Sequence, residues 1–228
     1  MTVFAMLLVP RMTQLDFTGP YEVFARCPGA KVELVWKSLE PVATEYGLTI
    51  TPTATFDTLG QADVLFVPGG VGINEVLNDP QALAWTRRVA PGAKYITAVC
   101  TGALFLGAAG LLKDKKATTH WTAMEMLPLL GATPVKERSV ISGNVVTGGG
   151  VTAGIDFALR LASEMYGREV AQSIQLTIEY NPLPPFNAGH PDTAPRPILD
   201  ALRARIQPRQ AERLKQVNRA AERLLAGA

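Results

Sequence analysis

Residues 95–107 read YITAVCTGALFLG, and this stretch decides the fold. The apolar, β-branched run at 95–99 is typical of a buried strand, and a helix is expected directly after Cys100. The small residues Gly102 and Ala103 let that helix approach its neighbours closely. A strand, a reactive side chain and a helix in succession make a nucleophile elbow. Open α/β sheets bind ligands at the carboxyl ends of their strands, so Cys100 is the candidate nucleophile.

The state of Cys100 has two interpretations. The positive end of a helix dipole lowers the pKa of a thiol, which predicts a reactive thiolate. Alternatively, Cys100 is simply a small buried hydrophobe. We favour the reactive thiolate because of its position at the end of the strand.

Outward from this stretch, short apolar runs alternate with segments of helical period, which predicts βαβ units and an α/β fold with a mostly parallel sheet. Strands are expected at residues 3–9, 32–36, 63–67, 95–99, 133–135 and 145–147, with a small antiparallel pair at 41–43 and 48–50. Helices are expected after Thr18 (the N-cap, with Pro20 in the first turn), after Asp79, and at 101–109, 122–130 and 152–166.

The composition fits a globular intracellular protein. Hydrophobic residues make up 47% and charged residues 18% of the 228 residues, which excludes disordered and fibrous classes. Two cysteines cannot form a disulfide framework and fit a cytoplasmic setting. The opening MTVFAMLLVP is predicted to be a core strand and not a signal peptide. No apolar run approaches the roughly 18 residues that span a bilayer.

The C-terminal part differs from the rest. Residues 181–197 contain six prolines, which predicts a surface-wrapping segment with little regular structure. Residues 196–228 are helical in composition and carry eight Lys/Arg against three Asp/Glu, a net charge of +5. We expect a solvated or dimer-packing helix in preference to a nucleic-acid-binding arm.

Three loops are expected at the same sheet edge as Cys100. Residues 68–70 (PGG) either present backbone N–H groups to an anion or form a turn that needs positive φ. Residues 148–150 (GGG) allow a similarly close approach. The third, residues 18–20 (TGP), follows Asp16, which itself comes after the first strand and either caps a helix or projects toward Cys100.

The histidines give weaker signals. His120 could form a dyad with Cys100, but a lone histidine is more often structural, and we favour the structural role. His190 is the only other histidine, and no residues have zinc-ligand spacing, so no metal site is expected.

Together these segments resemble the ThiJ/PfpI superfamily, whose members have a flavodoxin-like three-layer sandwich and an elbow cysteine. The matching segments are LVPRMTQLDFTGPYEVF, FVPGG, AVCTGALFLGAAGLL, ATTHW and GNVVTGGGVTAGIDFALRL. Within the superfamily, Asp16, Cys100-Thr101 and PPFNAGHPDTAP most resemble the isonitrile (isocyanide) hydratases. Peptidase-like members carry His where Thr101 stands, and the deglycase branch carries Glu where Asp16 stands, so both activities are disfavoured.

The resemblance implies a class I glutamine amidotransferase-like catalytic domain at 1–195 and a helical extension at 196–228. It also implies cofactor-free hydration of an isonitrile to an N-formamide, with Cys100 as nucleophile and Asp16 as general acid and base. Thr101 is expected to orient Asp16 or the water through its hydroxyl, or to lend its backbone N–H. Phe186 and the 181–197 segment are expected to wall the pocket. The expected substrate-binding residues are Gly70, Val71, Gly149 and Val151.

The resemblance further implies a homodimer with no nucleic-acid or membrane partner. Two alternatives stay open. One is a glyoxalase or deglycase acting on reactive aldehydes. The other is a cysteine redox sensor or a regulatory domain related to AraC-type regulators, whose Cys-Thr-Gly and ATTHW signatures are similar. Those regulators continue into a helix-turn-helix region, for which we expect no room in 228 residues.

Overall fold

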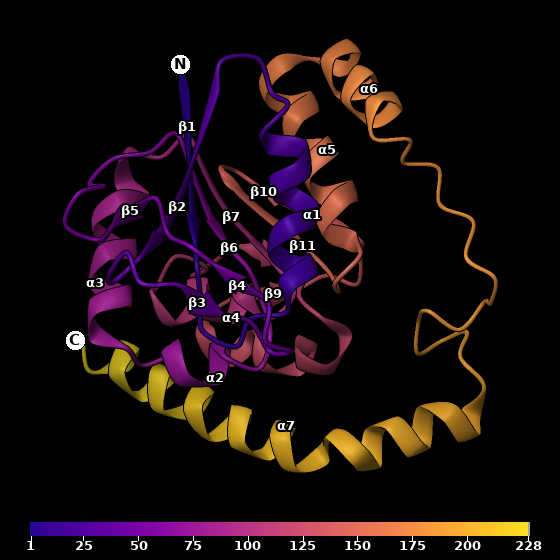
Figure 1. Ribbon diagram of the computed structural model, residues 1–228. Coiled ribbons are helices and arrows are strands. Elements are labelled where there is room, and N and C mark those ends of the chain that lie inside the picture. The colour runs from indigo at the N-terminus through magenta and orange to yellow at the C-terminus, as the bar shows by residue number, and fades with distance from the viewer. Residues whose placement is uncertain (228) are drawn as a thin grey trace.

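Buried apolar strands form a seven-stranded sheet in the order β10-β11-β7-β6-β1-β2-β5 in the computed structural model, which describes residues 1–227 (Figure 1). Neighbouring strands are parallel except β10 and β11. The sheet strands are β1 (Thr2–Leu7), β2 (Ala30–Trp36), β5 (Ala54–Thr55), β6 (Val64–Val67), β7 (Tyr95–Val99), β10 (Ser139–Ser142) and β11 (Val145–Gly148). Two-residue strands pair separately, β3 (Val42–Ala43) with β4 (Thr49–Ile50) and β8 (Lys116–Ala117) with β9 (Thr133–Pro134).

Helices cover both faces of this sheet. They are α1 (Gln14–Phe24), α2 (Ile73–Val76), α3 (Pro80–Val89), α4 (Gly102–Ala108), α5 (Ala153–Tyr166), α6 (Arg168–Thr177) and α7 (Arg196–Leu225). Figure 1 places α1 and α5 on one side of the sheet and α3 on the other, and α4 packs on β6 and β7. The expected α/β three-layer sandwich with a mostly parallel sheet is confirmed.

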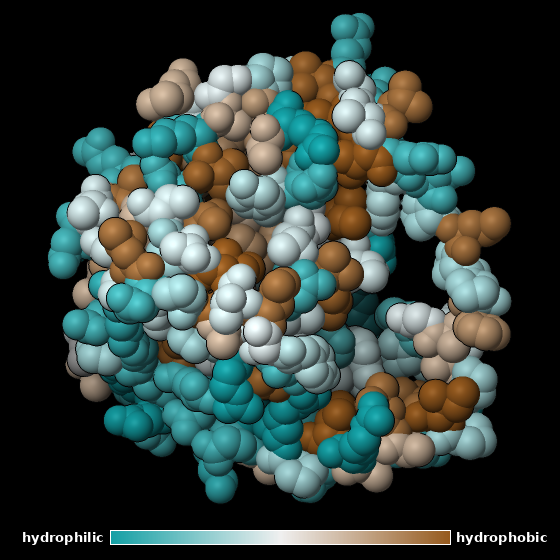
Figure 2. Space-filling model, viewed as in Figure 1, coloured by the Kyte–Doolittle hydropathy of each residue, from teal (hydrophilic) through white to brown (hydrophobic). Residues whose placement is uncertain are grey.

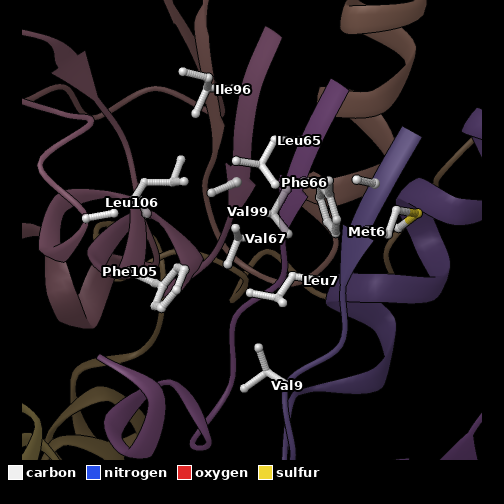
Figure 3. Close-up of a cluster of buried hydrophobic side chains, with 14 of the residues drawn as sticks. Met6, Leu7, Val9, Leu65, Phe66, Val67, Ile96, Val99, Phe105 and Leu106 are labelled. Atoms are coloured by element: carbon white, nitrogen blue, oxygen red, sulfur yellow. The ribbon is translucent and has the colours of Figure 1, made fainter. Parts of the chain in front are cut away.

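The core lies where the central strands are covered on both sides. Every residue of β6 is buried, as are the last four residues of both β1 and β7. Figure 3 shows Leu65 and Val67 of β6 beside Val99 of β7, with Phe105 and Leu106 of α4 against them. This two-sided burial explains why the strands read as continuous apolar runs.

The strand order has a switch point between β1 and β6. The chain runs outward from β1 to β2 on one side and to β6 and β7 on the other. Ligands bind outside the carboxyl ends of the strands at such a switch point. The segments that follow β1, β6 and β7 all start at this end of the sheet.

Two local expectations need correction, two elements were not expected, and one expected helix cap is confirmed. α1 begins at Gln14, with Thr13 as N-cap, because the Thr18 hydroxyl donates to the Gln14 carbonyl at 3.1 Å inside the helix and Pro20 lies mid-helix. Residues 122–130 form two 3₁₀ helices, η2 (Trp121–Met126) and η3 (Pro128–Leu130), in place of one helix. Strand β10 and helix α6 were not expected. The cap at Asp79 is confirmed: its carboxylate accepts from the N–H groups of Gln81 and Ala82.

Residues 181–195 form a strap of bends and turns between α6 and α7, as expected. The strap does not wrap the body of its own chain: Figure 2 shows open space between the two. Helix α7 runs along the edge of the body (Figure 1) and buries Leu199, Arg213, Val217 and Ala220, and its Arg203 lies over the Trp121 ring. No helix within residues 1–227 is long and apolar enough to cross a membrane.

Candidate active site

Cys100 occupies the sharp turn between β7 and α4. Its φ is +53°, a conformation that non-glycine residues rarely adopt and that costs of order 1–3 kcal/mol. The backbone N–H of Cys100 donates to the carbonyls of Gly148 (3.1 Å) and Gly149 (2.7 Å), and its carbonyl accepts from the Thr119 hydroxyl at 2.6 Å. These bonds hold the strained turn at the carboxyl end of β7, as in a nucleophile elbow.

Gly102 allows the start of α4 to pack directly against the end of β6. A Cβ at this position would lie 2.4 Å from the Val67 carbonyl oxygen and 2.6 Å from that of Pro68. The close approach of helix and strand expected from the sequence is therefore present, and it requires glycine.

Asp16 lies in the first turn of α1 and is completely buried. Among the described residues, no donor lies at a normal hydrogen-bond distance and angle from either of its carboxyl oxygens. Buried polar groups without partners are rare in native structures and often mark catalytic sites. Of the two roles weighed for Asp16, the structure supports projection toward Cys100, and Asp16 makes no capping bond.

Asp16, Cys100 and Thr101 meet around the Cα of Gly69. A Cβ placed on Gly69 would lie 2.8 Å from Asp16 Oδ2, 2.7 Å from Cys100 Cβ and 2.6 Å from the Thr101 nitrogen. The loops after β1, β6 and β7 thus supply the carboxyl, the glycine and the thiol of one site.

This crowding predicts a large effect for Gly69→Ala. Because the added methyl has no space, the carboxyl and the elbow must separate, and we expect catalytic activity to fall about a hundredfold. Steady-state kinetics measure this, with circular dichroism to confirm the fold. Gly92→Ala is the control, since a Cβ there meets nothing within 4 Å. Equal activities of the two variants would contradict the crowded geometry.

The protonation states of the pair are set by burial. Burial raises the pKa of Asp16 from its ordinary 3.8 to about 7, and the approach of the Cys100 thiol and the Gly69 N–H offsets only part of this. Burial and the adjacent Asp16 also raise the pKa of Cys100 well above its usual value, opposed by the Thr101 N–H and by Arg213. The lowered thiol pKa expected from the helix terminus is therefore wrong. Two anions cannot share this dry site, which agrees with the expectation that the pair holds one proton between its members.

The side chain of Thr101 is hydrogen-bonded to the backbone of the loop after β6. Its hydroxyl accepts from the Gly70 N–H at 3.0 Å and lies 3.1 Å from the Gly70 carbonyl. It therefore does not orient Asp16. The Thr101 backbone N–H, the other role expected for this residue, faces the sulfur of Cys100 and lowers its pKa.

The expected substrate-binding residues fall into two groups. The N–H of Gly70 is taken by Thr101, and the N–H of Gly149 donates to the Arg138 carbonyl at 3.0 Å, so both glycines hold loops and neither N–H is free for a ligand. Val71 and Val151 are half-buried on the loops after β6 and β11, where they remain candidates.

His120 and Phe186 do not contribute to the Cys100–Asp16 pair. The Nδ1 atom of His120 lies 2.8 Å from the Thr122 hydroxyl and accepts from its N–H. Burial lowers the pKa of His120 to about 4, so the ring is neutral and structural. Phe186 is 77% exposed on the strap, so the expectation that it walls the pocket is wrong for the single chain.

Helix α7 brings two arginines that were not expected at the site. Arg213 is buried and its Nε donates to Asn74 Oδ1 at 2.8 Å, while Arg209 pairs with Glu45 at 3.5 Å. The signal for Arg213 was present in the sequence, because it shares a helix face with the apolar Val217 and Ala220.

A cleft of about 640 Å³ runs between α2 and α7 beside the site. Its lining does not include Cys100 or Asp16; it consists of Arg11, Val71, Asn74, Glu75, Arg209, Glu212 and Gln216. No cluster of three or more His, Cys, Asp or Glu side chains within residues 1–227 could hold a metal ion.

The flavodoxin-like sheet and the strained cysteine elbow define a class of α/β proteins, and a family comparison agrees. Residues 2–164 match the DJ-1/PfpI family, and the chain belongs to this family.

Among its relatives, the chain is 52% identical to the isonitrile hydratase of Pseudomonas putida over 96% of both chains. It is 28% identical to the HTH-type transcriptional regulator CdhR of Pseudomonas aeruginosa, over 75% of this chain and 53% of the regulator. A crystal structure of a ThiJ/PfpI family protein from Pseudomonas syringae superposes with a TM-score of 0.91 at 44% identity, covering 96% of this chain and 90% of that one. The resemblance to ThiJ/PfpI proteins and to isonitrile hydratase is therefore confirmed.

Proposed function

We propose that this chain is an isonitrile hydratase, a hydro-lyase that converts R–N≡C and water to R–NH–CHO. The observation that carries the proposal is the meeting of Asp16 and Cys100 around Gly69. It occurs in a chain that matches a known isonitrile hydratase over nearly its whole length.

The first half-reaction uses the proton that the pair shares. Asp16 takes the thiol proton as the sulfur of Cys100 adds to the terminal carbon of the isonitrile, forming a C–S bond. The electron pair left on that carbon takes the proton from the Asp16 carboxyl. The product is a thioimidate, R–N=CH–S–Cys100. Because the pKa of Asp16 is about 7, it can accept and return this proton near neutral pH.

The second half-reaction consumes water. Asp16, again a carboxylate, removes a proton from water as the oxygen adds to the thioimidate carbon, and it returns this proton to the nitrogen. The hydroxyl proton that remains on the former water oxygen is the one that Cys100 takes when the C–S bond breaks. The tetrahedral species then forms its C=O bond as the C–S bond breaks. Cys100 recovers a proton and the formamide leaves. The N–H of Thr101 faces the sulfur and stabilises the negative charge that develops there.

The activity is tested directly with a small panel of alkyl and aryl isonitriles. We expect formamide to appear at catalytic rates. Methylglyoxal should give no lactate, and peroxide should oxidise Cys100 slowly, because a buried neutral thiol is a poor target. Turnover of methylglyoxal without turnover of any isonitrile would replace this function with a glyoxalase activity.

We also propose that the protein is a cytoplasmic homodimer, with the strap and the start of α7 packed on a second copy. Large apolar side chains on these segments and at the end of α6 are exposed: Leu176 (82%), Leu183 (93%), Phe186 (77%) and Ile198 (59%). Burial of such side chains supplies about 1.5–3 kcal/mol each. A second copy would cover them and fill the open space in Figure 2.

Light scattering after size exclusion is expected to give twice the 24.5 kDa of one chain. Replacing Phe186 and Leu183 together by Ser should shift the equilibrium toward the monomer. The matched control replaces the exposed Tyr46 and Leu39 by Ser on the body of the molecule and should leave the mass unchanged. A monomeric parent protein at micromolar concentration would contradict this assembly.

A further inference from the structure

The hairpin of β3 and β4 is hydrogen-bonded to the segment that leads from β1 into α1 (Figure 1). The Arg11 N–H donates to the Ala43 carbonyl of the hairpin at 2.8 Å. In return, the Glu45 N–H donates to the Met12 carbonyl at 2.9 Å. Met12 also forms a β-bridge with Gly70, on the loop after β6. These backbone contacts place Glu45, in the turn of the hairpin, beside two of the loops that form the active site.

Thr13 is the N-cap residue of α1, but its hydroxyl does not cap the helix. A threonine at this position normally accepts a hydrogen bond from the N–H of the second or third helical residue. The third helical residue is Asp16, and its N–H donates to the Thr13 carbonyl at 3.0 Å. The Thr13 hydroxyl instead donates to Glu45 Oε2 at 3.4 Å. Glu45 therefore holds the N-cap side chain away from the turn that carries Asp16.

The backbone of Thr13 is packed against the loop after β6. Its N–H donates to the Gly69 carbonyl at 3.1 Å, and a Cβ on Gly70 would lie 2.3 Å from the same nitrogen. Asp16 and Cys100 meet around Gly69, as described above. A side chain that fixes Thr13 therefore also fixes the first turn of α1 relative to the loop around which the pair is built.

The Glu45 carboxylate is held from a second side. Its side chain is 19% exposed, and Oε1 lies 3.5 Å from the guanidinium of Arg209 on α7. Because the carboxylate is mostly buried, solvent screens its charge less than at the surface. Burial is the main cause of the raised pKa of Asp16, and the negative charge of Glu45 adds to it.

We propose that Glu45 is a positioning residue for the hydration: through Thr13 it fixes the turn of α1 that presents Asp16 to Cys100. Its contacts are with Thr13 and Arg209, so it acts on the reacting groups through another residue. The charge of Glu45 serves the same end, because a nearby anion favours a proton on Asp16. The inference rests on the proposed function, in which Asp16 is the acid and the base.

Glu45→Ala tests the inference with two readouts. Because Thr13 is released and Asp16 is no longer fixed, kcat for hydration at the pH optimum should fall about tenfold, while KM changes by less than about twofold. Alkylation of Cys100 by iodoacetamide, followed by peptide mapping, should become about two- to threefold faster near neutral pH, since Asp16 then raises the pKa of the thiol less. Glu40→Ala is the matched control: Glu40 is exposed before β3, and both rates should stay at the parent values.

Glu45→Gln separates the charge of Glu45 from its contact. Glutamine keeps the length of the side chain and an acceptor for the Thr13 hydroxyl, so most of kcat should be retained. The pH optimum of hydration should move down by about 0.3–0.5, because the anion that favours a proton on Asp16 is lost. The groups whose charges act on Asp16 are Cys100 and Glu45, and Arg209 faces Glu45, so only one of these charges changes.

Thr13→Val tests the contact from its other side and keeps the test decisive if Glu45→Ala does not fold. Valine has the shape of threonine without the hydroxyl, and kcat should fall by about the same factor as in Glu45→Ala. The double variant should be no slower than either single variant, because both substitutions break one contact. The Tm of Thr13→Val should stay close to that of the parent, since this hydroxyl does not cap α1.

The inference would be overturned by any of three results. They are parent values of kcat and alkylation rate in Glu45→Ala, equal changes in Glu45→Ala and Glu40→Ala, or losses of kcat that add in the double variant. A parent protein that turns over no isonitrile would remove the proposed function alone. Alkylation needs no isonitrile, so its rate still shows whether Glu45 positions Asp16.

Discussion

Replacing Cys100 with alanine should abolish formamide formation, lowering kcat by on the order of 10⁴-fold or more, as the loss of a covalent nucleophile does. The substitution removes only a sulfur atom from a buried turn and should leave the fold intact. Alanine suits the elbow poorly because its φ of +53° disfavours any Cβ, but cysteine already bears that cost. Product formation measured by mass spectrometry decides the outcome.

Cys27→Ala is the matched control for this experiment. Cys27 is also buried, and burial raises its pKa to about 11, but it lies after α1 beside the amino end of β1, at the opposite end of that strand from Asp16. This variant should keep the parent rate. A folded Cys100→Ala protein that still makes formamide would remove the covalent mechanism.

Asp16→Asn should produce two effects of opposite sign. Hydration should fall about 10²- to 10⁴-fold, because an amide cannot carry the proton to carbon or take one from water. Alkylation of Cys100 near neutral pH should become faster, since Asp16 raises the pKa of the thiol and the amide carries no charge. Unchanged hydration, or slower alkylation, would contradict the assigned role of Asp16.

The same substitution should alter the pH dependence of stability. The pKa of Asp16 is about 7 in the folded protein and near 3.8 unfolded, so the folded state holds more protons between these values and loses stability as the pH rises. The shift corresponds to on the order of 4 kcal/mol by pH about 7. Asp16→Asn should remove most of this pH-dependent loss of stability, because asparagine does not ionise. The unpaired amide lowers the stability of the variant by an amount that does not depend on pH. Thermal melts between pH about 4 and 8 would show a flatter curve for the variant.

The part of the fold predictable from sequence is the part built by local rules. The apolar runs of β1, β6 and β7 predict strands that are buried on both faces, and they are so buried. A strand followed by Cys100 and small residues predicts the elbow, whichever strands lie beside it. The start of α1 was misplaced because Thr18 has the residue type of a cap but bonds within the helix. Strand β10 was missed although Gly143-Asn144, between two β-branched runs, signals a hairpin.

The chemistry of the site depends on distances that no local rule contains. The prediction that the helix terminus lowers the pKa of Cys100 was wrong because burial and Asp16 raise it more, and burial is a property of the whole fold. Arg213 contacts Asn74 across 139 positions of the chain, so this partner could not be predicted from helical periodicity alone. Asp16 and Cys100 were paired correctly because both follow parallel strands, whose carboxyl ends share one edge.

The most direct test of the account is the mass of the protein during a single turnover. Excess enzyme is mixed with a slowly hydrated isonitrile, quenched in acid and mapped by peptide mass spectrometry. The account predicts a transient increase equal to the full mass of the isonitrile, located on Cys100 and absent from Cys27. Formamide that forms while Cys100 stays unmodified at every time point would contradict it.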